Sequence, residues 1–157
     1  MKTPGIRNSA RAQRGVYAIE FALVFLILFS LMYGIICYGM IFTFRMGLQN
    51  AAEDGARAAL QYQNTVEGRR QRAQAVASAQ SNWMPSIVNL APTAQVCTVE
   101  DGNCVAAKCG TTWVMRCQVV VTITANNLRA LLPPLPNFAI PDQIVGQATM
   151  LLDGKSQ

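Results

Sequence analysis

The sequence lacks the features on which most enzymes and redox proteins depend. Its 157 residues contain no histidine, the commonest general base and the commonest metal ligand in proteins. Charged residues make up only 13% of the chain, and there is no nucleophile motif, convergent set of carboxylates or Cys-x-x-Cys pair. We therefore expect no enzymatic activity, no catalytic residue, no cofactor and no metal site.

The positive charge of the chain is concentrated at its N-terminus. The net charge is +5, and four basic residues precede residue 15 with no acidic residue among them, namely Lys2, Arg7, Arg11 and Arg14. The rest of the chain is close to neutral. A basic surface for nucleic acid is therefore not indicated, and no nucleic-acid partner is expected.

A long apolar run follows this basic segment. Residues 21–44 form 24 consecutive positions without a charge, Pro, Asn or Gln. As a helix the run would reach roughly 36 Å, enough to cross a hydrocarbon core of roughly 30 Å. The alternatives are a buried helix of a soluble core, which rarely needs such length, and a cleaved secretory signal, whose apolar region spans only about 7–15 residues.

The charge distribution around the run predicts its orientation. Because basic residues flank the cytoplasmic side of membrane helices, we expect the N-terminus in the cytoplasm and the chain beyond Arg45 outside it. The predicted location is the bacterial inner membrane, spanned once, with the C-terminal domain in the periplasm. The lipid bilayer is then one partner of the chain.

The junction between the basic segment and the apolar run contains a recognisable pattern. Gly15 ends the basic segment, and Glu20 and Phe21 stand where the apolar run begins. A carboxylate at the membrane edge is costly and suggests a function. The pattern resembles the prepilin-peptidase site of type IV pilin-like proteins, which implies cleavage between Gly15 and Val16. The same resemblance implies that Glu20 pairs with the freed N-terminus of a neighbouring subunit.

Two segments together resemble one family. The sequence Gly-x-x-x-x-Glu-Phe-Ala-Leu-Val at residues 15–24 is similar to the start of TadE-like proteins, and the Ala- and Arg-rich residues 48–59 are similar to their next helix. These are minor pseudopilins of tight-adherence (Tad, type IVc) pili. The resemblance implies a role in initiating or assembling a pilus for surface adhesion. The implied partners are a prepilin peptidase, other pilins and pseudopilins, and the inner-membrane assembly platform. The alternative is a membrane-anchored binding module that never joins a filament.

Two further helical patterns each allow two interpretations. Small or apolar residues recur at helical spacing at Leu48, Ala52, Gly55, Ala59 and Tyr62. This face either packs against other subunits or packs within its own domain. The basic run at residues 68–72 is either a solvated helix face or a site for an anionic surface.

Four cysteines lie beyond the apolar run, whereas Cys37 lies inside it as a small apolar residue. An even number in an oxidising compartment favours two disulfides among Cys97, Cys104, Cys109 and Cys117. If residues 94–99 and 113–124 form one antiparallel hairpin, the pairs Cys97–Cys117 and Cys104–Cys109 are centred on nearly the same position. This favours nested bridges, Cys97 to Cys117 and Cys104 to Cys109. The alternative is a zinc site built from all four sulfurs.

The predicted fold class is α+β. A long N-terminal transmembrane helix continues into a helical spine and is followed by a small, disulfide-bridged antiparallel sheet domain. A second helix is expected at residues 66–83 and a closing strand at 144–152. The predicted organisation is a basic leader at 1–15, the anchor and spine at 16–62, and an extracytoplasmic domain at 63–157.

Overall fold

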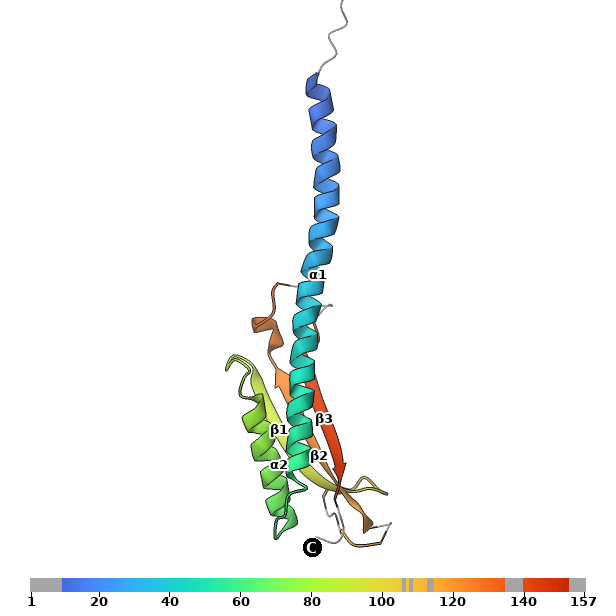
Figure 1. Ribbon diagram of the computed structural model, residues 1–157, viewed down its shortest axis with the longest axis vertical. Helices are drawn as coiled ribbons and strands as arrows, with labels where there is room; N and C mark the ends of the chain where they lie inside the picture. The colour runs from blue at the N-terminus through green and yellow to red at the C-terminus, as the bar shows by residue number, and fades with distance from the viewer. Residues whose placement is uncertain (1–9, 106, 108, 113–114, 135–139, 153–157) are drawn as a thin grey trace, which may run out of the picture. The chain divides into compact units, whose positions relative to one another are not determined.

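The computed structural model describes residues 10–105, 107, 109–112, 115–134 and 140–152, with no side chains described for residues 10–14. The first nine residues of the predicted leader, and residues 113–114 of a predicted strand, therefore lie outside the described part. The elements are helix α1 (Ala10–Ala58), helix α2 (Val66–Ser81), strand β1 (Asn89–Thr98), strand β2 (Cys117–Asn126), the short 3₁₀ helix η2 (Leu128–Ala130) and strand β3 (Gln143–Leu151) (Figure 1). The α+β class is confirmed.

The chain divides into two compact units, Met1–Gly39 and Met40–Gln157, and α1 contributes to both. In the first unit, every large apolar side chain from Val16 to Leu31 is at least half exposed. The second unit contains the C-terminal part of α1, together with α2 and the sheet. Within the described residues, the hydrophobic core lies in the second unit, where the helices and the sheet bury each other's apolar faces.

The small-residue face of α1 packs inside its own domain. Leu48, Ala52, Gly55 and Ala59 are all buried there, whereas Tyr62 is 79% exposed. A Cβ atom added at Gly55 would lie 2.8 Å from the Cβ atom of Ala77 in α2. Glycine and alanine thus let α1 approach α2 closely, and the interpretation of this face as a subunit contact is wrong.

Helix α2 begins at an N-cap. The Thr65 hydroxyl accepts a hydrogen bond from the backbone N–H of Gly68 at 3.0 Å, which satisfies one of the free amides of the first turn. The predicted basic face is divided: Arg70 is paired at the surface with Glu67 at 2.6 Å, whereas Arg69 is only 4% exposed. The basic run is therefore not one solvated face.

The sheet is antiparallel with the order β1-β2-β3. Along β2 the odd-numbered residues from Cys117 to Ala125 are buried and face the helices, while the even-numbered residues are partly or fully exposed. This alternation is expected of a sheet covered on one face. On the covered face, the side chain of Val121 lies against Gly55 of α1.

A glutamine from a helix closes each edge of the sheet. The Gln49 side chain donates to the carbonyl of Gln147 at 2.9 Å and accepts from the N–H of the same residue at 3.2 Å, so its amide takes the place of a neighbouring strand beside β3. At the other edge, the Gln74 side chain donates to the carbonyl of Pro92, a residue without an N–H. Both contacts restrict strand addition, the usual hazard of an exposed sheet edge.

Candidate assembly site

The predicted processing and assembly residues lie together on one exposed stretch of α1. Gly15, Val16, Glu20 and Phe21 are all helical and exposed, with 66% of Val16 and 70% of Phe21 accessible. Val16 and Glu20 are four residues apart, so they share a helix face about one turn from each other. The helix therefore presents the predicted cut site and the predicted assembly carboxylate at one accessible location.

The fold of this chain does not require a glycine at position 15. A Cβ atom added there would meet nothing within 4 Å, and the residue has no positive φ angle. By contrast, a Cβ atom at Gly47 would lie 2.3 Å from the Trp83 ring, so packing explains that glycine. A helical glycine costs about 1 kcal/mol relative to alanine. The presence of Gly15 therefore calls for a reason outside the packing of the chain.

Glu20 carries an unpaired charge at the start of the apolar run. Within the part of the chain that the structure describes, its carboxylate makes no hydrogen bond and no ion pair. The next acidic residue along the chain is Glu53, which in contrast accepts from Gln49 and lies 3.9 Å from Arg57. The Glu20 carboxylate is thus available for a cation supplied from elsewhere.

An aromatic stripe, which the sequence reasoning missed, follows this site. Phe21, Phe25, Phe29 and Tyr33 stack in succession, with ring centroids 5.9, 5.8 and 6.3 Å apart. Their i, i+4 spacing is readable from the sequence and brings side chains together on one face of a helix. The stripe gives one side of the helix a continuous row of aromatic rings, which suits packing in lipid or against other helices.

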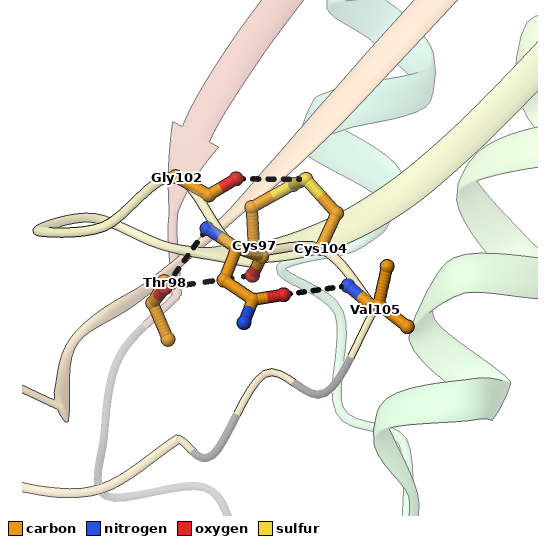
Figure 2. Close-up of a disulfide and its surroundings, with 6 residues drawn as sticks. Cys97, Thr98, Gly102, Cys104 and Val105 are labelled. Carbon is orange, nitrogen blue, oxygen red and sulfur yellow. Dashed lines mark hydrogen bonds between the residues drawn. A yellow bond between two sulfur atoms is a disulfide. The ribbon is translucent and has the colours of Figure 1, made fainter.

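The four cysteines form two disulfides, as predicted, but the predicted pairing is wrong. Cys97 is bonded to Cys104, and Cys109 to Cys117 (Figure 2 shows the first bridge). The reason is the register of the hairpin: Cys97 lies opposite Gln118, and Cys117 lies opposite Thr98. The two sulfurs therefore project from opposite faces of the sheet, and no bridge can join them. A zinc site on these four cysteines is also wrong, because zinc binds thiolates.

Each disulfide closes a short loop at the end of its own strand. The first holds a tight turn in which Thr98 donates its N–H to the Asn103 carbonyl and Gly102 adopts a positive φ of 62°. In the turn, the Asn103 side chain also accepts from the N–H of Val105 at 3.0 Å (Figure 2). By loop-closure entropy each bridge stabilises the fold by about 2.5 kcal/mol. The bridges close two local loops and do not join β1 to β2.

The exposed stretch of α1 lies in a segment that matches a known protein family. Residues 15–57 match the model of a family described as TadE-like protein. This match confirms the TadE-like resemblance. The TadE-like segment begins at Gly15, contains Glu20 and Phe21, and extends to Arg57 near the end of α1. The match covers 43 of the 157 residues. No curated protein and no solved structure matches the chain.

The TadE-like segment covers most of the helix that fits a membrane anchor. Within the described residues, Gly15–Ala58 is the candidate membrane span, long and apolar enough to cross a bilayer. Only its C-terminal part, from Met40 onward, belongs to the unit that contains the sheet. The segment thus combines an apolar anchor with the small-residue face that packs inside the domain.

Proposed function

We propose that the chain is a minor pseudopilin of a Tad-type pilus, anchored by α1 in the inner membrane with its sheet domain in the periplasm. The observation that carries this proposal is a combination of three features on α1: a glycine unexplained by packing, a carboxylate five positions later that has no partner among the described residues, and an exposed apolar run. These features fall within the segment that matches TadE-like proteins. The role is structural and not enzymatic.

In this proposal a prepilin peptidase hydrolyses the peptide bond between Gly15 and Val16. Hydrolysis leaves a carboxylate on Gly15 in the leader and a free amine on Val16 in the mature chain. The amine is protonated near neutral pH, because the ordinary pKa of an α-amino group is about 8. The mature anchor then begins with a cation four residues before Glu20.

The new cation and the Glu20 carboxylate pair between neighbouring subunits. Either charge alone is costly in an apolar helix bundle, and pairing offsets part of the desolvation. A subunit whose amine meets the carboxylate of its neighbour is favoured over one shifted along the bundle axis. The pair therefore sets the axial position of an incoming subunit relative to its neighbour in the pilus. The subunit reaches that position from the membrane through the inner-membrane assembly platform.

The disulfides support the proposed topology. Bridges such as Cys97–Cys104 and Cys109–Cys117 form and persist in oxidising compartments such as the periplasm. The four basic residues before residue 15 favour a cytoplasmic N-terminus by the positive-inside rule. Both observations support a sheet domain on the periplasmic side of the membrane, from which pili extend.

The test is incorporation of Glu20→Ala and Glu20→Gln variants into pili sheared from cells that carry the complete Tad system. We expect both variants to insert in the membrane and to be processed, but to be depleted at least about tenfold from the pilus fraction, which corresponds to roughly 1.4 kcal/mol. Glu53→Ala is the matched control, since Glu53 is a surface carboxylate on the same helix. Normal incorporation of both Glu20 variants would rule out the pairing.

The runner-up function, an anchored envelope module, predicts a different distribution. Its chain would stay in the membrane fraction and be absent from sheared pili, with or without Glu20. The wild-type protein in the same experiment therefore decides between the two functions.

A further inference from the structure

The turn between α2 and β1, residues 82–88, has an unusual composition for its position. Residues 86 and 87 form its tip, and the Val88 N–H donates to the Pro85 carbonyl at 3.0 Å. Such positions normally carry small or polar residues. Here Ile87 stands at the tip with 48% of its surface exposed, and Trp83 is also 48% exposed. Two large apolar side chains are thus displayed by a turn that does not bury them.

The turn is held in place and does not hang free. Asn127, at the end of β2 and with a positive φ of 65°, donates from its side-chain amide to the Ile87 carbonyl at 3.0 Å. The Trp83 ring stacks on the ring of Phe44 in α1 at 6.0 Å and lies against Gly47. Exposure of Trp83 and Ile87 is therefore built into the fold.

The stack of Trp83 on Phe44 places the turn beside the end of the apolar run. Phe44 is the last residue of the uncharged apolar run at 21–44, and the exposed Arg45 follows it at once. A run of 24 residues exceeds by several positions the roughly 20 that span a hydrocarbon core. If α1 is the anchor, its last apolar turn then lies at the edge of the hydrocarbon core, and so does the Trp83 ring stacked on it.

We propose that Trp83 and Ile87 form a docking surface that binds the periplasmic leaflet of the membrane in which α1 is anchored. The chemistry fits a lipid surface, because tryptophan prefers the boundary between hydrocarbon and water and the Arg45 guanidinium can bind headgroup phosphates. The inference rests on the anchor of the proposed function but not on processing or on the filament. Contact with lipid at the turn holds the Trp83 and Ile87 side chains at the membrane surface.

The test uses the full chain in phosphatidylcholine–phosphatidylglycerol vesicles and quenching of tryptophan by lipids brominated near the headgroup end of their acyl chains. Trp113→Phe leaves Trp83 as the single tryptophan. If that variant misfolds, the difference between wild type and Trp83→Phe isolates the same signal. We expect bromolipids to quench Trp83 at least about twofold, as for a ring at the interface.

Two further variants separate lipid contact from general apolar exposure. Ile87→Asp should reduce the quenching, because a carboxylate at the turn tip opposes entry into the interface. Val105→Asp is the matched control: Val105 is 97% exposed but lies beyond the far end of β1, about 30 Å from the turn. It should leave the quenching unchanged.

The possible results bear differently on the two proposals. Unquenched Trp83 in a chain that resists alkaline extraction from vesicles would overturn the lipid contact and leave the anchor standing. Extraction by alkali would overturn both the anchor and the contact. A quenched Trp83 in a chain that never enters pili would support the contact and contradict the pseudopilin function.

Discussion

Replacing Gly146 by alanine is expected to destabilise the sheet domain, although a change from glycine to alanine usually stabilises a protein. Gly146 has no positive φ, so its backbone conformation suits alanine, and alanine in place of glycine ordinarily stabilises by about 0.4–1 kcal/mol through the unfolded state. In this chain the new Cβ atom would lie 2.5 Å from the backbone carbon of Leu48 and 2.8 Å from the backbone nitrogen of Gln49. These are main-chain atoms of α1 and cannot rotate away.

Two losses at this contact determine how far Gly146→Ala lowers the free energy of unfolding. Overpacking of a close contact costs about 1–3 kcal/mol. Displacement of α1 also weakens the two hydrogen bonds between Gln49 and Gln147, each worth about 0.5–1.5 kcal/mol. After the gain in the unfolded state is subtracted, the free energy of unfolding should fall by about 1–5 kcal/mol. At a urea dependence of about 2 kcal/mol/M, the urea midpoint should then fall by about 0.5–2.5 M.

The assay is urea unfolding of the full chain in detergent, with disulfides intact, followed by circular dichroism. Gly68→Ala is the matched control, because its nearest neighbours are side-chain ends at 3.2 and 3.4 Å, and as a helical glycine it should gain about 0.4–1 kcal/mol of stability on this change. In a double-mutant cycle, Gln49→Ala should cost less in the Gly146→Ala background than in the wild type. A Gly146→Ala domain as stable as the wild type, or more so, would refute the close packing of α1 on β3.

Three other predictions test separate parts of the structure. Trypsin without reduction should release residues 73–108 as a free peptide and 109–116 joined to 117–129, whereas nested bridges would hold all three together. Hydrogen bonds from Arg70 lower the pKa of the exposed Glu67, so Arg70→Gln should raise that pKa in a carboxyl NMR titration, and an unchanged value would contradict the pair. Because the folded pKa is the lower one, the stability contributed by Glu67 is present above its ordinary pKa and should be lost as pH falls through the lowered value.

The order of elements was predictable from the sequence because it depends on local patterns. An uncharged run of 24 residues, a helical stretch before Pro85 and β-rich segments around Cys97 and Cys117 each indicate their own structure. The predicted helix at 66–83 corresponds to Val66–Ser81, and the closing strand at 144–152 to Gln143–Leu151. Element boundaries differ by a few residues, as local signals leave them imprecise.

The disulfide pairing was not predictable because it depends on a single residue of register. Placing Cys97 opposite Cys117 and placing it opposite Gln118 are almost equally compatible with the sequence, yet they put the cysteine on opposite faces of the sheet. The structure has the second arrangement, with Cys97 opposite Gln118. The connection between the strands then closes as two local loops.

The roles of α1 residues depended on partners distant in the sequence. Helical periodicity identified the face with Leu48 and Gly55 but not what covers it, since a neighbouring subunit and the same domain require the same small residues. Gln49 bonds to Gln147, 98 positions away, and no local pattern connects the two. The exposed assembly residues Gly15 and Glu20 were accessible to sequence reasoning because they form a short linear motif.

The central claim is that the chain is processed as a pilin, and the N-terminus of the protein isolated from its native membrane tests it most directly. Intact mass and N-terminal sequencing should give a chain that begins at Val16 and lacks the preceding residues, with both disulfides still formed. An intact leader, in cells with an active prepilin peptidase, would contradict the account and leave Gly15 and Glu20 without their proposed roles.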